Sequence, residues 1–118
     1  MGTVVVPLGI GDPQGRRFEN IEAIVDTGST FTAIPRTTLQ RLGVPVERSV
    51  QSELADGSHA PVDIGRAMVR LEGQEFPTPV IFAEAGEPTL LGVVTLEEAL
   101  LAVDPVSGRL IPTNVLRL

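Results

Sequence analysis

A chain of 118 residues, 42% of them hydrophobic, is long enough for one compact domain, residues 1–118, with a mainly aliphatic core. Its formal net charge of −6 argues against nucleic acid or an anionic membrane as a partner. Cysteine, lysine, tyrosine and tryptophan are absent and His59 is the one histidine, which excludes thiol nucleophiles, disulfides, lysine Schiff bases and multi-histidine metal sites. The side-chain groups that remain for catalysis are chiefly carboxylates and hydroxyls. No apolar run approaches the length of a membrane span, so we expect a soluble, cytoplasmic protein.

The N-terminal part of the chain predicts strands and one brief helix. A β-branched run opens it, and a glycine-rich loop at residues 9–15 precedes a second run with imperfect alternation of apolar and polar positions. Pro35 is placed to begin a helix and Gly43 to end it. The predicted strands are residues 3–8, 16–25 and 31–34.

The middle of the chain predicts two hairpins. Residues 55–58, Ala-Asp-Gly-Ser, separate strand-like arms at residues 48–54 and 60–71, and Asp-Gly between such arms is a strong hairpin signal. A second turn at residues 72–75 leads into residues 76–83. This last segment contains two prolines, which lack an amide hydrogen, so we predict an edge strand.

The C-terminal part predicts a short buried strand at residues 89–92, Thr-Leu-Leu-Gly, followed by a helix. Thr95 and Glu98 have the spacing of a capping box, which places this helix at residues 96–102. The last predicted elements are a strand and an apolar tail, residues 109–111 and 115–118. The whole pattern predicts a mainly β domain with one short C-terminal helix.

Residues 25–30, Val-Asp-Thr-Gly-Ser-Thr, are the most informative part of the sequence. The acidic residue stands where an apolar run breaks into a tight turn, and a second apolar run follows. Burying a carboxylate there costs several kcal/mol unless it is hydrogen-bonded or protonated. The placement indicates a carboxylate with a chemical role. The alternative is a turn residue that accepts hydrogen bonds from nearby backbone amides.

Asp26-Thr27-Gly28 with its apolar flanks resembles the active-site loop of the aspartic proteases. The Asp-Gly hairpin stands where these enzymes carry a flap, and residues 90–92 resemble their hydrophobic-hydrophobic-glycine element, which precedes a helix. The size and the single Asp-Thr-Gly resemble the retroviral, one-domain branch. The resemblance implies a retropepsin-like closed β-barrel with one lobe per chain, acting on a peptide or protein without a cofactor or metal.

The resemblance also implies a role for each residue of the loop. Asp26 is expected to be half of a carboxylate pair in which one member is the general base toward water and the other, protonated, donates to the scissile carbonyl. Thr27 is expected to lock two loops together, and Gly28 to let the backbone approach the carboxylate. The expected peptide contacts are Ser29 and Thr30 in the loop and Ala55, Asp56, Gly57 and Ser58 in the flap.

A carboxylate pair requires two such loops, and the chain offers one, so we expect a homodimer with Asp26 facing its symmetry mate. Asp63-Ile64-Gly65 lacks the hydroxyl residue and lies too close in sequence to be a second lobe, so we interpret Asp63 as a strand or turn residue. By resemblance, the terminal segments, residues 3–6 and 115–118, contribute to the dimer interface.

Two departures from the retroviral pattern leave a second function open. Retroviral enzymes commonly pair an acidic residue two places after the active-site glycine with an arginine after the later glycine, whereas this chain has Thr30 and Val93 there. The hairpin tip also lacks the glycine-rich retroviral flap sequence, and an ordinary exposed turn containing His59 is its alternative interpretation. A non-catalytic peptide-binding or dimerisation module therefore stands beside the protease as a hypothesis.

Overall fold

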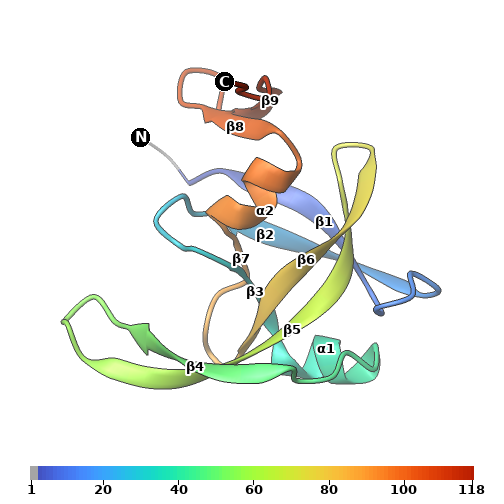
Figure 1. Cartoon of the computed structure of the whole chain (residues 1–118), viewed down its shortest axis with the longest axis vertical. Helices are drawn as coiled ribbons and strands as arrows, with labels where there is room; N and C mark the ends of the chain where they lie inside the picture. The colour runs from blue at the N-terminus through green and yellow to red at the C-terminus, as the bar shows by residue number, and fades with distance from the viewer. Residues whose placement is uncertain (1–2) are drawn as a thin grey trace.

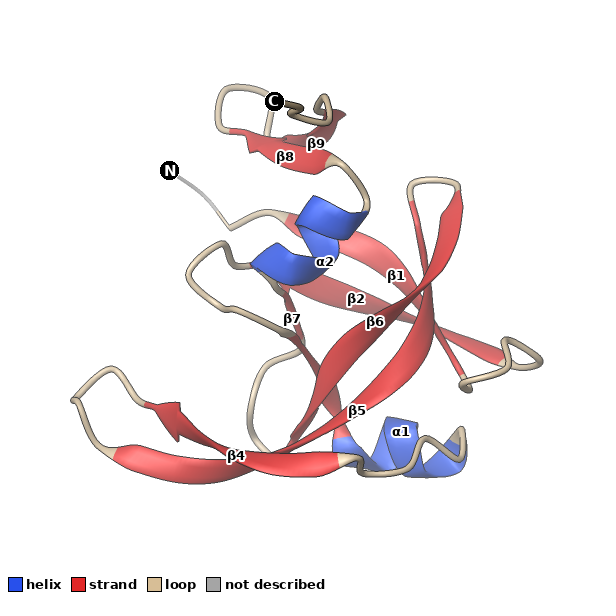
Figure 2. Ribbon diagram, viewed as in Figure 1, coloured by secondary structure: helices blue, strands red, loops and turns tan. Residues whose placement is uncertain are grey.

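The fold is seen in a computed structural model that describes residues 3–118 as a single, mainly β unit with two short helices (Figures 1 and 2). Seven strands form one sheet in the order β1-β2-β7-β3-β6-β5-β4, and β8 pairs with β9 in a separate sheet. Strand β1 also pairs with β5, so six strands close into a ring, and β4 extends from β5 outside it. The strands are β1 Val5–Gly11, β2 Phe18–Val25, β3 Thr32–Pro35, β4 Arg48–Glu53, β5 His59–Leu71, β6 Gln74–Ala83, β7 Leu90–Leu91, β8 Leu101–Asp104 and β9 Arg109–Pro112.

The core is one cluster of mainly aliphatic side chains from the ring strands and both helices. Its fully buried members include Ile10 of β1, Ile34 of β3 and Val69 of β5. This confirms the aliphatic core predicted from the composition, with Phe82 as the single buried aromatic side chain among the described residues.

Strand β1 extends further than predicted. Residues 9–11 belong to the strand, because Ile10 is fully buried and Gly11 lies against the ring of Phe18, where a Cβ would approach Cε2 to 2.6 Å. The turn is instead made by Asp12, whose Oδ1 accepts hydrogen bonds from the amides of Arg17 and Arg16, each at 2.7 Å. The amide of Arg17 above all lowers the pKa of Asp12 below its ordinary value.

The prediction that residues 76–83 form an edge strand is wrong, because β6 lies between β3 and β5. The two prolines nevertheless occupy a restricted part of the strand. Pro77 and Pro79 pair with β5 alone, and the pairing with β3 begins only at Val80. Their missing amides therefore fall where the other side of β6 has no strand partner, so the ladder loses no hydrogen bond there.

The helices also differ in part from expectation. Helix α1 spans Arg36–Arg41 and ends before Gly43, whose φ of +72° favours glycine, as predicted. Helix α2 spans Val93–Glu98, so it begins and ends earlier than predicted, and no side chain caps it. Thr95 lies inside this helix with its hydroxyl committed to tertiary hydrogen bonds, and the capping-box interpretation is therefore wrong. The apolar tail, residues 115–118, forms no strand within the chain and is exposed.

Candidate active site

Asp26 begins the loop between β2 and β3, directly after β2 pairs in parallel with β7. Its amide donates to the carbonyl of Leu91 at 3.0 Å, which fixes the start of the loop against β7. Its carboxylate Oδ1 accepts a hydrogen bond from the amide of Gly28 at 3.0 Å. A Cβ at Gly28 would lie 3.3 Å from that same oxygen, so the absence of a side chain permits the close approach.

The rest of the loop is held by the first amides of α2. Val93 donates to the carbonyl of Ser29 at 2.8 Å, and Val94 donates to the carbonyl of Thr30 at 3.0 Å. These are amides that a helix leaves without an intrahelical partner, so the loop and the helix satisfy each other. Backbone hydrogen bonds thus connect the segments that contain Thr30 and Val93, the two positions where retroviral enzymes commonly have an ion pair.

A chain of three buried threonine hydroxyls supports the junction of β7 and α2. Thr32, Thr95 and Thr78 are fully buried, with Oγ1 separations of 2.6 Å between the first two and 2.9 Å between the last two. The amide of Gly92 donates to Thr32 at 3.1 Å, and Thr78 donates to the Glu98 carboxylate at 2.6 Å. Because the ends are an obligatory donor and an obligatory acceptor, each hydroxyl donates to the next in one direction, toward Glu98.

Gly92 completes this support by its size. A Cβ added there would lie 2.5 Å from the carbonyl oxygen of Phe31 and 2.8 Å from the amide nitrogen of Thr32. Both atoms are backbone, which cannot rotate away as a side chain can. The glycine of the Leu-Leu-Gly element is therefore required for β7 to pass against the end of the Asp26 loop.

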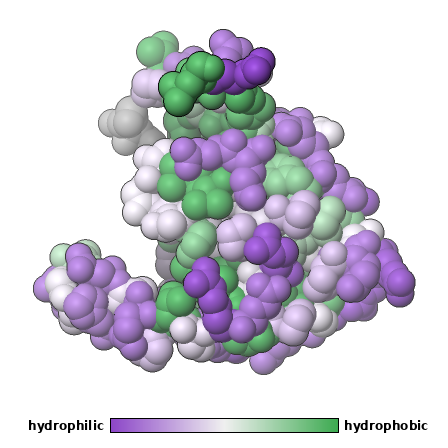
Figure 3. Space-filling view, viewed as in Figure 1, coloured by the Kyte–Doolittle hydropathy of each residue, from purple (hydrophilic) through white to green (hydrophobic). Residues whose placement is uncertain are grey.

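The Asp26 loop and the β4–β5 hairpin face each other across a groove of about 650 Å³. In the space-filling view the hairpin is an arm that stands apart from the body of the molecule, with a hollow between them (Figure 3). Along β4, Val50 and Ser52 are half-buried whereas their neighbours are exposed, which indicates that this side of the hairpin faces the groove. The lining residues are Asp26, Gly28, Ser29, Thr30, Phe31, Val50, Gln51, Ser52, Glu53, Leu54, Ala55, Val62, Ile64, Ile81 and Leu90.

The structure therefore brings together five of the residues predicted from the sequence, Asp26, Gly28, Ser29, Thr30 and Ala55. Residues 56–58 form the tip of the hairpin outside this lining, where the hydroxyl and amide of Ser58 donate to the Asp56 carboxylate and lower its pKa. Sequence reasoning missed both arms of the hairpin and the floor residues Ile81 and Leu90. The alternation of polar and apolar residues within the arms was a signal for the arms. No such signal existed for Ile81 and Leu90, because they come from strands far apart in the sequence.

Thr27 lies on the other face of the loop. It borders a separate apolar groove of about 530 Å³ between β2, α2 and β8. The apolar lining of this second groove is Val4, Ile24, Val25, Val93, Leu96, Leu101, Ala102, Val103 and Pro105. The loop thus directs its carboxylate residue to one hollow and its threonine to another.

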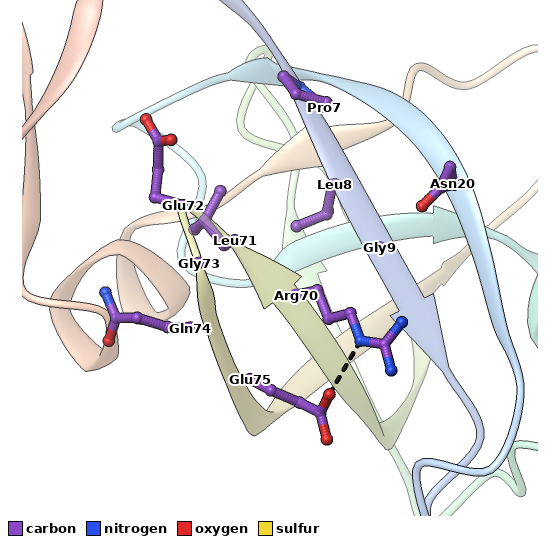
Figure 4. A pocket seen from close by; sticks show the side chains of 10 residues that line it. All are labelled: Pro7, Leu8, Gly9, Asn20, Arg70, Leu71, Glu72, Gly73, Gln74 and Glu75. Atoms are coloured by element: carbon purple, nitrogen blue, oxygen red, sulfur yellow. Dashed lines mark hydrogen bonds and ion pairs between the residues drawn. The ribbon is translucent and has the colours of Figure 1, made fainter.

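A third hollow, of about 340 Å³, lies between β1 and the β5–β6 hairpin (Figure 4). None of the predicted site residues lines it. Its charged side chains include Arg70 and Glu75, which bind each other at 2.8 Å. Elsewhere, Asp63 lies in β5, which confirms that it is a strand residue, and His59 is exposed beside Glu53. Within residues 3–118, no three histidine or acidic side chains are grouped as a metal site requires.

A six-strand ring carrying an Asp-Thr-Gly loop opposite a hairpin is the architecture of the retropepsin-like aspartic proteases. The chain matches a family model described as aspartyl protease over residues 6–95, and it belongs to that family. A comparison with curated proteins gives no match. Within residues 3–118, neither helix is long enough to cross a membrane.

The solved structures that share the fold include two retroviral proteases and one retroviral protease-like domain. The retroviral protease-like domain of Ddi1 from Leishmania major is 23% identical, with a TM-score of 0.60 and coverage of 98% of this chain and 91% of that one. The EIAV protease complexed with the inhibitor HBY-793 is 17% identical, with a TM-score of 0.60 and coverage of 83% and 88%. The simian foamy virus (mac) protease is 16% identical, with a TM-score of 0.54 and coverage of 80% and 94%.

Proposed function

We propose that this protein is an aspartic endopeptidase that hydrolyses peptide bonds with a water bound between Asp26 and the Asp26 of a second copy. The observation that carries the proposal is the position of Asp26 in a groove roofed by a hairpin. Two carboxylates close enough to bind one water molecule between them share one proton. The ionised one takes a proton from the water as it attacks, and the protonated one donates to the carbonyl oxygen of the substrate.

The homodimer is required because one chain supplies one Asp-Thr-Gly loop. Thr27 is exposed and stands beside the apolar groove between β2, α2 and β8, which gives the partner an apolar surface to cover. The C-terminal tail adds exposed apolar side chains, Val115 and Leu116 among them. We assign the partner to this face, where the two Thr27 hydroxyls can meet and bring the two Asp26 loops next to each other.

The substrate that we propose for the groove is an extended peptide. The apolar lining of the groove, with Val50, Ile81 and Leu90 among the contributors, suits aliphatic or aromatic side chains on either side of the scissile bond. Backbone groups of the hairpin would hold the peptide main chain, as in other cases of strand addition. The resulting activity needs no cofactor. The cytoplasmic location and the absence of nucleic acid partners stay predictions from the sequence.

The test is cleavage of a mixed peptide library between pH 3 and pH 7 by the wild type, Asp26→Asn and Glu19→Gln, with products identified by mass spectrometry. Glu19 is the control because its carboxylate binds Arg41 outside both grooves, so Glu19→Gln should cleave at the wild-type rate. We expect Asp26→Asn to lose at least about a thousandfold in rate while it keeps its circular dichroism spectrum and dimer mass. Undiminished cleavage by Asp26→Asn refutes the assignment.

The second candidate, a non-catalytic peptide-binding or dimerisation module, is favoured by one observation. Residues 56–58, the tip of the hairpin and the part expected to act as the flap, do not line the groove that contains Asp26. A confirmed dimer that binds library peptides without cleaving any of them supports the module. Cleavage that disappears in Asp26→Asn supports the enzyme.

A further inference from the structure

Asp63, the acidic residue of the second Asp-x-Gly sequence, is part of a charged cluster at the base of the β4–β5 hairpin. Its Oδ2 accepts from Nη2 of Arg36 at 2.8 Å, and its Oδ1 accepts from the hydroxyl of Ser49 at 2.5 Å. Arg36 also binds the Glu84 carboxylate with two nitrogens, Nε at 3.0 Å and Nη2 at 2.9 Å. Its guanidinium lies 5.0 Å from the centre of the Phe82 ring. The guanidinium of Arg36, which belongs to α1, therefore connects this helix with β5 and with the C-terminal end of β6.

These three elements meet where the hairpin leaves the body of the molecule. Ser49 and Asp63 are partners in the β4–β5 register, and the next residue, Ile64, already pairs with Ile81 of β6. Beyond this point, the β4 and β5 segments at residues 50–53 and 59–62 pair only with each other. Arg36 begins α1 immediately after β3, the strand that follows the Asp26 loop.

The backbone at this point leaves little room. A Cβ on Gly65 would lie 2.5 Å from the carbonyl oxygen of Pro45, and the amide of Glu47 donates to the carbonyl of Ile64 at 2.8 Å. The chain before β4 is thus held closely against β5. A movement of the hairpin relative to the Asp26 loop must bend the two strands just beyond this point, beside Ser49 and Asp63.

We propose that Arg36 and Asp63 are positioning residues that set the angle of the β4–β5 hairpin over the Asp26 groove. One carboxylate oxygen of Asp63 accepts a hydrogen bond from Ser49 at the base of the hairpin, and the other accepts one from Arg36. Arg36 is held in turn by the Glu84 carboxylate and the Phe82 ring. The side chains of Arg36 and Asp63 are 27% and 31% exposed, so water screens this pair less than a fully exposed one. The bidentate geometry toward Glu84 fixes the guanidinium plane, which a lysine could not do.

The first measurement is amide hydrogen exchange in the wild type, Asp63→Asn, Ser49→Ala and Arg36→Lys. Asp63→Asn replaces a carboxylate on Arg36 by an amide of equal size. We expect amides in the hairpin, residues 50–62, to exchange roughly fivefold faster in Asp63→Asn, and amides of β1 and β2 to keep their wild-type rates. Ser49→Ala removes one hydrogen bond and should give a smaller acceleration confined to the same residues. Arg36→Lys keeps the charge and should fall between the wild type and Asp63→Asn.

The matched control is Glu19→Gln, which weakens the Glu19–Arg41 ion pair, also 2.8 Å long, at a site outside the hairpin. It should leave the exchange of residues 50–62 unchanged. Equal acceleration throughout the chain in Asp63→Asn, or wild-type rates within the hairpin, overturns the proposal. If Asp63→Asn does not fold, Ser49→Ala and Arg36→Lys decide the question by the same criterion.

The second measurement rests on the proposed function. If the wild type cleaves peptides, Asp63→Asn should raise KM several-fold with a much smaller change in kcat, because the hairpin binds substrate but does not take part in the chemistry. A fall in kcat at constant KM overturns the positioning role. If the wild type cleaves nothing, the proposed function fails, and the exchange data still decide the role of Arg36 and Asp63.

Discussion

Replacing Thr95 by valine tests the hydroxyl chain that supports the Asp26 loop. Valine has nearly the shape of threonine, so the change leaves no cavity and removes the hydrogen bonds to Thr32 and Thr78. Each such bond contributes about 1 kcal/mol net, and stranding its buried partner costs more. Thr32 keeps the Gly92 amide and Thr78 keeps Glu98, so neither partner is stranded completely. We therefore expect a loss of about 2–3 kcal/mol in the free energy of unfolding.

The assay is urea denaturation followed by far-ultraviolet circular dichroism, because the chain has no tryptophan or tyrosine for fluorescence. The midpoint should fall while the m-value stays constant. Thr95→Ser keeps the hydroxyl and loses one methyl group, which costs roughly 1 kcal/mol. A valine variant within about 0.5 kcal/mol of the wild type, or less destabilised than the serine variant, refutes the reasoning about the hydroxyl chain.

Three further changes test other parts of the structure. Gly92→Ala should cost at least about 3 kcal/mol in the same assay or prevent folding, because its Cβ meets the backbone of Phe31, and a loss below about 1 kcal/mol contradicts this. Gly43→Ala, where the added Cβ meets nothing within 4 Å, should cost only about 1 kcal/mol from its φ of +72°. The pKa of Asp12 is lowered in the folded chain, so its contribution to stability is present above the unfolded pKa and lost as pH falls through the folded pKa. Asp12→Asn should therefore flatten the loss of stability as the pH falls through and below the ordinary aspartate pKa of 3.8 in a series of urea titrations, and an unchanged slope argues against this role.

The features that the sequence predicts well are those encoded by neighbouring residues. The β4–β5 hairpin follows from Asp-Gly between two strand-like arms, and the end of α1 follows from Gly43. The loop at Asp26 follows from an acidic and a glycine residue after an apolar run. In each case the backbone preference of a few consecutive residues decides the structure.

The features that the sequence predicts poorly depend on contacts with residues far along the chain. Thr95 has the local spacing of a cap, but its hydroxyl binds Thr32 and Thr78, and this tertiary use displaces the cap. The prolines of β6 indicate an edge, but β3 joins the same strand only from Val80 onward. The groove itself has a floor that includes Ile81 and Leu90, which no local pattern assigns to the Asp26 loop.

The dependence of the Asp26 loop on β7 and α2 has a consequence for biosynthesis. Leu91, Val93 and Val94 supply backbone partners to the loop, yet they are translated more than sixty residues after Asp26. A nascent chain that has not yet released these residues from the ribosome cannot hold the carboxylate in place. The Asp26 loop therefore reaches its hydrogen-bonded arrangement only after residues 91–94 have left the ribosome and packed against it.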